Sequence, residues 1–561
     1  MQNIPGYGRG GITILKEYKR ITVAENCHGC FACEVACKQE HSLPVGPRWI
    51  RVYPDMREVG GQWRLSYFVT ECGRAAPAPC QLACPAGLNA WHYVSLASQG
   101  KFKEALEVIR KTTPFAGVLG RVCTRPCELD CERGKVDVPV AIRALKRFLA
   151  DHEMQSGREK ATPVKQTKDS QVAIIGSGPT GLSCAYDLIR QGYPVTVFET
   201  DERPGGQLRY GIPENRLPKQ IVDDEIGYIE ELGVEIKTNT PIKDLSGVLS
   251  QEYQAIFLAA GAHLSQKMEI PGEDTEGVTY ALDFLKRLNS GQKVTLGEKV
   301  AVIGGGNTAV DAARVALHMG VKEVSIIYRR SRAEMPAMAA EVEEAEREGV
   351  KVDFLAVPTR ILSKGNQLTG IECVRMELGE YDASGRRSPV PVRGSQFNVD
   401  IDNLLVAVSE SVDKAMLPEG LKSTERGTVH VNPHTLQTNV VGVFAGGDVV
   451  TGPRDVVGAI AAGKEAAVSI DRYLSGMDLR EDRSTTARVL REVTKGDSIR
   501  TVTALIDEKK AIAEAKRCLN CGVCAETLEN GLQTACVNAC PSHCIYYRDI
   551  WEITPKTGPY L

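Results

Sequence analysis

The sequence lacks any long run of apolar residues. Its longest apolar candidates, around residues 255–262 and 404–408, are short enough to be buried strands, whereas a helix needs roughly 18 such residues to cross a bilayer. The N-terminal stretch also lacks the apolar core of a secretory signal. These absences predict a cytoplasmic chain without direct membrane insertion.

An excess of either charge is also missing. The 561 residues include 68 basic and 71 acidic side chains, which gives a formal net charge of −3. Proteins that bind nucleic acids by neutralising phosphates carry a marked basic excess, so no nucleic-acid partner is expected. At about 150 residues per domain, the length favours roughly three to five domains.

Cysteine is scarce in the middle of the chain and abundant towards both ends. Of 18 cysteines, ten lie within residues 27–131 and six within 518–544, which leaves only Cys184 and Cys373 between them. A disulfide framework would suit a small secreted protein, so metal ligation in a reducing compartment explains the distribution better. The two isolated residues are expected to be core or surface thiols.

The middle of the chain alternates between β-rich runs and helical patterns, from residue 171 to about residue 474. This alternation is typical of parallel α/β architecture. Residues 171–189 also resemble residues 299–317, and each segment has an apolar run, a glycine turn and a helical pattern. Two nucleotide-binding units in one chain are the simplest interpretation.

The first glycine turn has the pattern of an FAD site. Gly176, Gly178 and Gly181 come after an apolar strand, where they permit a tight turn, close approach to a pyrophosphate and close helix packing. The next strand ends at Glu199, whose carboxylate can accept hydrogen bonds from both ribose hydroxyls. Further on, Asp448 comes after another strand and precedes a helix, where it can bond the ribityl chain of a flavin.

The second glycine turn, at residues 304–309, has the form G-x-G-x-x-A, and the strand after it ends differently. The position equivalent to Glu199 is Tyr328, and Arg329 and Arg330 come next. No carboxylate is present to repel a 2′-phosphate, and guanidinium groups suit that phosphate well. NADP(H) is therefore favoured over NAD(H), the alternative being that the arginines form a solvated turn.

The cysteine spacing at both ends predicts iron–sulfur clusters. A run of C-x2-C-x2-C-x3-C wraps one cubane face, whereas zinc usually takes two separated pairs. The sixteen candidate ligands are Cys27, Cys30, Cys33, Cys37, Cys72, Cys80, Cys84, Cys123, Cys127, Cys131, Cys518, Cys521, Cys524, Cys536, Cys540 and Cys544. Ten and six do not each divide by four, so some cysteines are unligated or another residue type contributes. We expect roughly three to four [4Fe–4S] clusters, with their pairing open.

Taken together, these motifs resemble the glutamate synthase small-subunit family, which includes the electron-input half of dihydropyrimidine dehydrogenase. The resemblance covers about residues 72–474 and rests on CPAGL (84–88), GRVC (120–123), PCELDC (126–131), AIRALKRF (141–148), PGGQLRYGIP (204–213), GGGNTAVDAARVA (304–316), YRRSRAEMPA (328–337) and FAGGDVVTGP (444–453). The segment 27–52 looks like the first cluster motif of polyferredoxin subunits of molybdopterin oxidoreductases. CLNCGVC near the C-terminus looks like the ferredoxin tail of longer relatives.

The resemblance implies a multidomain α/β fold with nested FAD and NAD(P)H Rossmann-like domains. A helical iron–sulfur domain precedes them, and ferredoxin-like segments lie at both termini. The expected boundaries are 1–68 for the N-terminal ferredoxin-like segment, 69–160 for the helical iron–sulfur domain, 170–298 with 415–476 for the FAD domain, 299–414 for the NAD(P)H domain and 477–561 for the C-terminal ferredoxin-like domain.

The motifs and the resemblance together imply the cofactor contacts. Those for FAD are Gly176, Ser177, Gly178, Pro179, Thr180, Gly181, Glu199, Gly206, Gln207, Leu208, Gly211, Ile212, Ala260, Gly261, Gly447, Asp448 and Val456. Those for NADP(H) are Gly304, Gly305, Gly306, Asn307, Thr308, Arg329 and Arg330. Three positions depart from the family pattern. Lys146 stands where several members have a Gln or Glu cluster ligand, and Glu410 comes after Ser409 where relatives often have Gly-Gln. Residues 69–71 supply no cysteine before Cys72, which leaves the first cluster of this pair to borrow a ligand from elsewhere.

The implied function is that of an NAD(P)H-dependent iron–sulfur flavoprotein oxidoreductase. No side chain needs to act as a general base, because the cofactors carry the chemistry. Electrons would pass to or from a partner redox subunit or ferredoxin, and the direction, the acceptor and any bifurcation stay open. One alternative is a flavin disulfide reductase, which would need a cysteine pair facing the flavin. The other is a relay or scaffold subunit with a vestigial flavin site.

Overall fold

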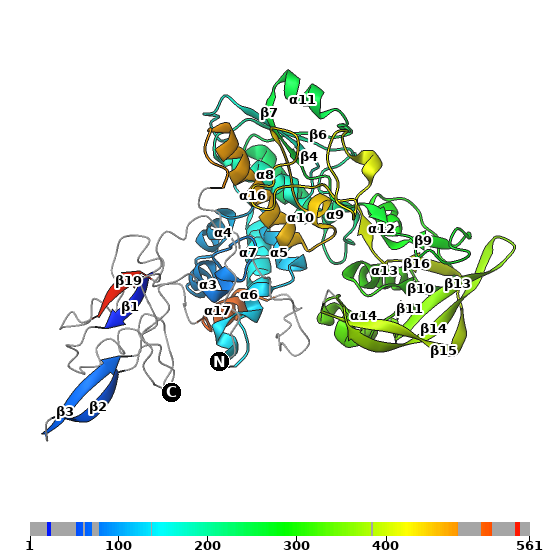
Figure 1. Ribbon diagram of the computed structural model, residues 1–561, viewed down its shortest axis with the longest axis horizontal. Helices are drawn as coiled ribbons and strands as arrows, with labels where there is room; N and C mark the ends of the chain where they lie inside the picture. The colour runs from blue at the N-terminus through cyan, green and yellow to red at the C-terminus, as the bar shows by residue number, and fades with distance from the viewer. Residues whose placement is uncertain are drawn as a thin grey trace. The chain divides into compact units, whose positions relative to one another are not determined.

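The chain forms two compact units in the computed structural model (Figure 1). The structure describes residues 78–135, 137–382, 385–480 and 506–518, and the backbone alone at 19–23, 52–59, 62–69, 250–251, 416 and 545–549. The helical unit comprises Met1–Gly120, Arg125–Arg158 and Glu481–Leu561, and the sheet unit comprises Arg121–Thr124 and Glu159–Arg480. Across the described ranges, no helix is both long and apolar enough to span a membrane.

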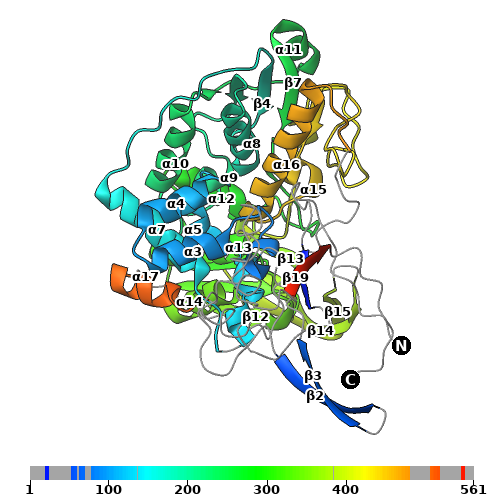
Figure 2. The ribbon, with the colours of Figure 1, turned by 90° about the vertical axis from the view of Figure 1, so that its left-hand side faces the viewer.

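The first sheet of the sheet unit has five parallel strands in the order β18-β7-β4-β5-β6. They are β4 (Gln171–Ile175), β5 (Val195–Phe198), β6 (Glu235–Lys237), β7 (Tyr253–Leu258) and β18 (Val443–Ala445). Helices α8 (Pro179–Arg190) and α16 (Val456–Leu474) pack on the sheet and lie side by side, as Figure 2 shows, while α10 (Lys219–Glu231) packs on α8. The burial of β4, β5 and β18 is therefore almost complete.

The contact between α8 and α16 depends on a glycine. A Cβ atom at Gly463 of α16 would lie 2.1 Å from the carbonyl oxygen of Thr180 in α8. The two helices join distant parts of the sequence, one directly after the first glycine turn and the other near residue 460. Their close packing holds the Asp448 region against the first glycine turn.

The second sheet of the sheet unit has five parallel strands in the order β12-β11-β10-β16-β9. They are β9 (Val278–Tyr280), β10 (Lys299–Ile303), β11 (Glu323–Tyr328), β12 (Lys351–Phe354) and β16 (Asn403–Val406). Helices α12 (Ala281–Asn289), α13 (Asn307–His318) and α14 (Ala339–Glu348) accompany it, and an antiparallel sheet of β13 (Ala356–Lys364), β14 (Gln367–Tyr381) and β15 (Arg387–Asp400) comes after them. The second sheet includes β9, which lies before residue 299, the predicted start of the NAD(P)H domain. The domain boundaries expected from the sequence stay predictions.

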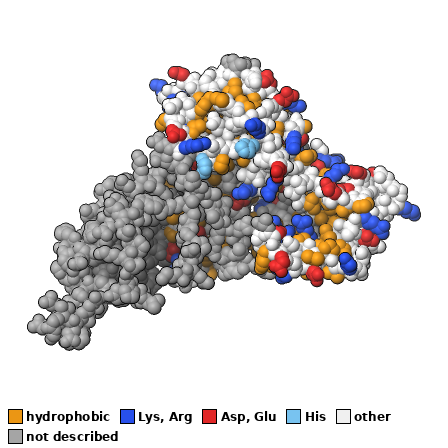
Figure 3. All heavy atoms as spheres, in the orientation of Figure 1, with side chains coloured by type: hydrophobic (Ala, Val, Ile, Leu, Met, Phe, Trp, Pro, Cys, Tyr) orange, Lys and Arg blue, Asp and Glu red, His pale blue; other side chains and the backbone are white. Residues whose placement is uncertain are grey.

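The two parallel sheets confirm the α/β class predicted from the sequence. On the face in Figure 3, basic and acidic side chains of the described residues are interspersed, in keeping with the balanced composition. Two further two-stranded pairings join backbone in the helical unit: β1 (Lys19–Val23) with β19 (Ile545–Asp549), and β2 (Val52–Val59) with β3 (Gln62–Val69). The β1–β19 pair connects the segments next to Cys27 and Cys544.

The remainder of the helical unit, within the described ranges, is built from short amphipathic helices. They are α2 (Pro79–Leu82), α3 (Ala90–Ser98), α4 (Phe102–Arg110), α6 (Pro126–Leu129), α7 (Ile142–Ser156) and α17 (Glu508–Ala515), while α5 (Ala116–Val122) spans the border between the units. Their apolar faces bury Tyr93, Ile109, Phe115 and Leu145 almost completely. Helix α17 comes from far along the sequence and packs against α3 and α7.

Candidate nucleotide and cluster sites

The first glycine turn joins β4 to α8 and leaves room for a phosphate group. Gly176 has a φ of 104°, and a Cβ atom there would lie 2.5 Å from the Ala259 carbonyl oxygen. At Gly181 a Cβ atom would lie 2.0 Å from the Gly176 carbonyl oxygen, so the helix packs closely on the turn. At Gly178, by contrast, no atom lies within 4 Å of a Cβ position. This open space beside a helix N-terminus fits a bound pyrophosphate.

Glu199 is held against this turn by hydrogen bonds. It comes directly after β5 and is only 8% exposed. Its Oε2 accepts hydrogen bonds from the backbone nitrogen of Ser177 at 3.0 Å and from the Ser177 hydroxyl, and its Oε1 accepts one from the Asp201 nitrogen at 2.9 Å. The carboxylate is thus fixed beside the first glycine turn, and its contact with a ribose stays a prediction.

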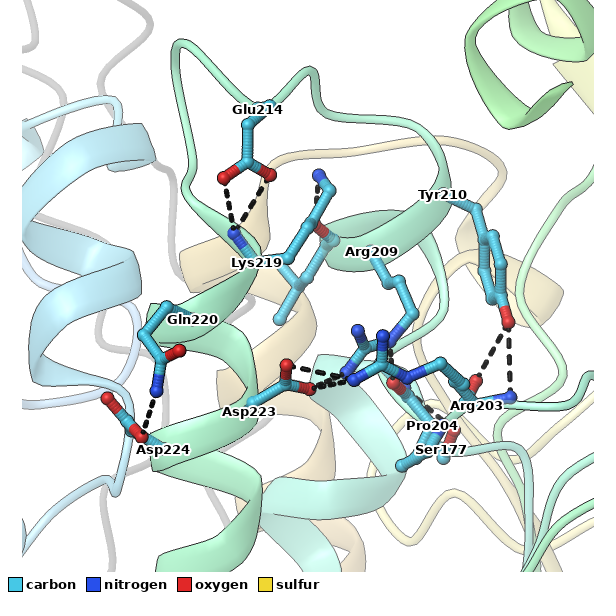
Figure 4. A network of polar contacts seen from close by, with 12 residues as sticks. Ser177, Arg203, Pro204, Arg209, Tyr210, Glu214, Lys219, Gln220, Asp223 and Asp224 are labelled. Atoms are coloured by element: carbon cyan, nitrogen blue, oxygen red, sulfur yellow. Dashed lines mark hydrogen bonds and ion pairs between the residues drawn. The ribbon is translucent and has the colours of Figure 1, made fainter. Parts of the chain in front are cut away.

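A polar network fixes the loop that carries Gly206, Gln207 and Leu208 (Figure 4). The backbone nitrogen of Gly205 donates to the Ser177 hydroxyl at 3.0 Å, which ties the loop to the first turn. The buried Arg209 pairs with Asp223 and donates to the Pro204 carbonyl oxygen at 2.5 Å. A Cβ atom at Gly206, whose φ is 51°, would lie 3.0 Å from the Gly178 Cα, so the two glycine segments touch.

The loop after β7 also contacts the first residue of α9 (Gln207–Tyr210). The Gln207 amide lies 2.8 Å from Nδ1 of His263, whose Nε2 lies 2.7 Å from the Ala260 carbonyl oxygen. Gly261, between them in sequence, has a φ of 76°. The structure thus brings Gln207, Ala260 and Gly261 of the predicted FAD set together.

Asp448 lies at the start of α15 (Asp448–Thr451), next to the first turn. The preceding Gly447 has a φ of 74°, and a Cβ atom there would lie 2.3 Å from the Thr180 hydroxyl. Burial raises the pKa of Asp448 to about 7, with further contributions from the carboxylates of Glu410 and Asp455. The side chain accepts a hydrogen bond from the Arg454 nitrogen at 3.2 Å, so one carboxyl oxygen remains for a ligand hydroxyl.

The second glycine turn repeats the first with a different neighbour. Gly304 has a φ of 148°, and a Cβ atom there would lie 2.2 Å from the Ala407 carbonyl oxygen. At Gly305 a Cβ atom would lie 2.3 Å from the ring of Tyr328, so the tyrosine packs directly on the turn. Gly306 again has open space at its Cβ position, which fits a second pyrophosphate.

The two arginines after Tyr328 have different surroundings. Arg330 is 5% exposed, pairs with Asp382 at 2.7 Å and donates from Nε to the Arg387 carbonyl oxygen at 2.8 Å. Arg329 is exposed and makes no hydrogen bond or ion pair with other residues that the structure describes. Of the pair, Arg329 is therefore the one whose guanidinium is available to an anion.

Two other residues predicted to contact NADP(H), Asn307 and Thr308, form hydrogen bonds within the protein. Oδ1 of Asn307 accepts a hydrogen bond from the Met338 nitrogen at 3.1 Å, and the Thr308 hydroxyl donates to Glu410 at 3.4 Å. Burial raises the pKa of Glu410, while the Thr308 hydrogen bond opposes that rise. Because Glu410 also contributes to the raised pKa of Asp448, the Ser409-Glu410 segment lies between the two candidate cofactor sites.

A buried ion pair links the two candidate sites and was not predicted from the sequence. Arg216, in the loop before α10, donates to Asp311 of α13 at 2.6 Å, and the two side chains are 9% and 7% exposed. Burial raises the pKa of Asp311 above its usual range, with Arg216 opposing it. The only sequence signal was an aspartate inside an otherwise apolar helical run. Nearby Lys219 is partly buried, and this desolvation lowers its pKa to about 8.

Six of the sixteen candidate cluster cysteines lie in the described ranges. They are Cys80, Cys84, Cys123, Cys127, Cys131 and Cys518. The other ten lie outside the described residues: Cys27, Cys30, Cys33, Cys37, Cys72, Cys521, Cys524, Cys536, Cys540 and Cys544. Cys80, Cys131 and Cys518 line one pocket of the helical unit. Burial raises the pKa of Cys131, so this thiol stays protonated at neutral pH until it binds a metal.

Lys146, which departs from the family pattern, and the two isolated cysteines are all buried. Lys146 of α7 is only 3% exposed, and the 2% exposed Glu128 accepts a hydrogen bond from the Arg143 nitrogen at 2.8 Å. Cys184 of α8 and Cys373 of β14 are both fully buried, and burial raises the pKa of each thiol. Cys184 belongs to a helix on the first parallel sheet, whereas Cys373 belongs to a strand of the antiparallel sheet. The two thiols therefore do not form the dithiol of a disulfide reductase.

Comparison with protein families gives two matches. The family described as pyridine nucleotide-disulphide oxidoreductase matches residues 170–463, the region of both parallel sheets. The family described as dihydropyrimidine dehydrogenase domain II, 4Fe-4S cluster, matches residues 69–158. These matches confirm the fold class and the resemblance stated from the sequence.

Three relatives illustrate the similarity. NADP(+)-dependent formate dehydrogenase subunit beta of Moorella thermoacetica is 47% identical over 425 residues, which cover 71% of this chain and 60% of that protein. NADPH-Fe(3+) oxidoreductase subunit beta of Geobacter sulfurreducens is 38% identical and covered to 79% and 75%, respectively. Glutamate synthase (NADPH) small chain of Azospirillum brasilense is 33% identical, covered to 73% and 89%. The chain thus spans less than two thirds of the Moorella protein.

A solved structure has a similar fold over part of the chain. FprA from Mycobacterium tuberculosis, in a His57Gln mutant, superimposes with a TM-score of 0.50 at 20% identity, covering 57% of this chain and 87% of that one. At this identity the match speaks for the fold alone.

Proposed function

Because this chain belongs to the pyridine nucleotide-disulphide oxidoreductase family and carries a 4Fe-4S domain of the dihydropyrimidine dehydrogenase type, we propose that it passes electrons between NADP(H) and iron–sulfur clusters through one FAD. It does so as a subunit of a larger redox enzyme. The observation that carries the proposal is the pair of glycine turns, at Gly178 and Gly306, each with open space for a phosphate beside a helix start.

The chain's own residues would hold FAD at the first turn. The backbone at Gly178 and the N-terminus of α8 bind the pyrophosphate. Glu199, fixed by Ser177, accepts hydrogen bonds from the ribose, and Asp448 meets the ribityl chain. Bound there, FAD supplies hydride chemistry with a nicotinamide and single-electron chemistry with clusters. The fit rests on the open cradle and on the unshared carboxyl oxygen of Asp448.

NADP(H) is the proposed nucleotide at the second turn. Arg329 presents an exposed guanidinium next to Tyr328, where an NAD-specific site would have a carboxylate. The names of the three relatives contain NADP(+) or NADPH. Arg330 contributes by fixing the backbone of this segment through Asp382.

We also propose three to four [4Fe–4S] clusters, held by the candidate cysteines at the two ends of the chain, and a partner that exchanges electrons with them. Three thiols facing one largely apolar pocket are a donor set suited to iron–sulfur ligation. The three relatives are each named as a beta subunit or small chain, which supports a partner redox subunit or ferredoxin. A cytoplasmic location stays a prediction.

Anaerobic purification and then iron, sulfide and flavin quantitation test this proposal. Absorption spectra are recorded before and after addition of NADPH or NADH. We expect one FAD and about twelve to sixteen irons per chain, with rapid bleaching by NADPH and slower bleaching by NADH.

Two results would contradict the proposal in different ways. Flavin without iron would remove the cluster relay. Iron without reduction by either nucleotide would leave a relay module whose flavin site is vestigial.

A further inference from the structure

One pocket of the helical unit brings together cysteines from both ends of the sequence. Cys80 lies in α2, Cys131 comes after α6, and Cys518 comes after α17. The pocket contains about 370 Å³ of space that no atom fills, part of it open to solvent. Most of its remaining lining is apolar, including Trp91 and Ile142. The sequence pattern placed Cys518 with the C-terminal cysteines, some 390 residues from the nearest member of the other group.

Helix α17 holds Cys518 in this place through a buried face. Ala511 and Ala515 are 0% and 1% exposed, where the helix packs against α3 and α7. Asp507 caps the helix by accepting a hydrogen bond from the Lys510 nitrogen at 2.8 Å. The backbone nitrogen of Cys518 then donates to the Ala515 carbonyl oxygen at 3.0 Å. The position of the cysteine is therefore set by an anchored helix.

Specific polar contacts tie the same segment to the chain just after Cys131. Arg517 pairs with Asp137 at 2.9 Å and donates to the carbonyl oxygens of Val138 and Pro139 at 2.5 and 3.3 Å. Glu514 accepts a hydrogen bond from the Ala141 nitrogen at 2.9 Å. These bonds fix the register of the C-terminal segment against residues 137–141, and with it the position of Cys518 relative to Cys131.

The placement of these cysteines around one pocket suits an iron–sulfur cluster. The thiolates of a cubane bind irons at different corners, so they stand farther apart than the ligands of one ion and surround a space. A pocket with cysteines on its wall meets that requirement.

We propose that Cys518 ligates a [4Fe–4S] cluster of the helical unit together with Cys80 and Cys131. The proposal rests on the proposed function, in which clusters are present at all. Each thiol gives up its proton when it binds iron, and three thiols leave one iron for a fourth ligand. The assignment supplies the borrowed ligand that the missing cysteine at residues 69–71 calls for. The C-terminal segment thereby becomes part of the cluster site of the helical domain.

Cysteine substitutions in the full chain test whether Cys80 and Cys518 serve one cluster. The variants are Cys80→Ala, Cys518→Ala and the double variant, with the buried Cys373→Ala as a matched control. Iron, sulfide and the EPR spectrum of the dithionite-reduced protein are measured, with FAD content as a check on folding. We expect each single variant to lose about four irons and the same EPR component, and the double variant to lose no more.

Additive behaviour would overturn the assignment. It is wrong if the double variant loses about eight irons, if the two single variants remove different EPR components, or if Cys518→Ala keeps all its iron. Failure of NADPH to reduce the flavin would contradict the proposed function and leave these iron counts unaffected, so the two failures are distinguishable.

Thiol labelling of the unaltered protein gives a second measurement that does not depend on a variant folding. Iodoacetamide is added anaerobically while a chelator removes the iron, and labelled peptides are monitored by mass spectrometry. We expect Cys80, Cys131 and Cys518 to become labelled together. Labelling of Cys518 while Cys80 and Cys131 stay protected, or the reverse order, would contradict a shared cluster.

Discussion

The two glycine turns of the sheet unit have a similar backbone conformation. They differ in the residue inside the turn and in the residue that packs against it. Both begin with a glycine of positive φ, and both leave open space at the second glycine, Gly178 or Gly306. In the first turn the residue between these glycines is Ser177, which donates two hydrogen bonds to Glu199. In the second it is Gly305, which makes room for the ring of Tyr328.

This difference shows where the selectivity of such a site lies. In the proposed function, both turns bind a phosphate through the same backbone groups. The end of the next strand, together with the residue that it packs on, would then decide whether a fixed carboxylate or an exposed arginine meets the ribose. The small residue inside the turn is therefore matched to the side chain opposite it.

Substituting alanine for the second glycine of one turn at a time should have the largest effect on cofactor binding. The φ and ψ of Gly178 and Gly306 are −70° and 177°, and −85° and 173°, which alanine adopts readily, and no atom lies near the Cβ position. Gly178→Ala should therefore fold and lose FAD, with roughly tenfold or weaker binding, a cost of about 1.4 kcal/mol or more. Gly306→Ala should keep FAD and weaken NADPH binding by a similar factor. Each variant is the control for the other, and an equal loss of both cofactors in both variants would contradict the assignment of one cofactor to each turn.

The two arginines offer the next test. Loss of a hydrogen bond to a charged group costs about 1.5–3 kcal/mol, so Arg329→Ala should raise the KM for NADPH roughly 10- to 150-fold and leave the KM for NADH unchanged. Arg330→Ala should act on stability instead, because it removes the buried partner of Asp382. Its melting temperature should fall by several degrees. Equal effects of both variants on the KM for NADPH would contradict the division of roles.

The stability of the FAD-free protein should depend on pH through Asp448 at the candidate flavin site. A carboxyl whose pKa is about 7 when folded and about 4 when unfolded binds extra protons in the folded chain. The contribution of Asp448 to stability is therefore present below about pH 4 and declines as pH rises to about 7. In FAD-free protein, Asp448→Asn should gain a few degrees of melting temperature over the unaltered chain at pH 8, with the gain vanishing towards pH 4. A constant difference across this range would show that Asp448 does not titrate there.

The smallest effect is expected at the isolated thiol of the flavin domain. Cys184 is fully buried in α8, and burial raises its pKa well above the usual range. Cys184→Ala should cost about 1 kcal/mol of stability and leave the rate of NADPH oxidation at the level of the unaltered protein. A complete loss of activity with FAD still bound would revive the disulfide reductase alternative.

The parts of the candidate sites that repeat local rules could be predicted from the sequence. The glycine turns, Glu199 and Asp448 could be predicted because each comes after a strand at a fixed offset. The separate roles of Arg329 and Arg330 could not, because they depend on Asp382 and the Arg387 carbonyl oxygen of another sheet.

Long-range packing explains the other omissions. The Arg216–Asp311 pair joins a loop and a helix that are 95 residues apart. Cys518 reaches its pocket only because α17 packs against α3 and α7, far away in the sequence. Its C-x2-C-x2-C spacing pointed to a local cluster and gave no sign of that contact.

The most direct test of electron transfer from NADPH through FAD to the clusters is an anaerobic titration of the full chain with NADPH, monitored by absorbance and EPR together. Substoichiometric NADPH should bleach the flavin and produce the EPR signals of reduced [4Fe–4S] clusters, and NADH should do so only at much higher concentration. Bleached flavin with clusters that stay oxidised, although dithionite can reduce them, would show that electrons do not pass from the nucleotide through FAD to the clusters.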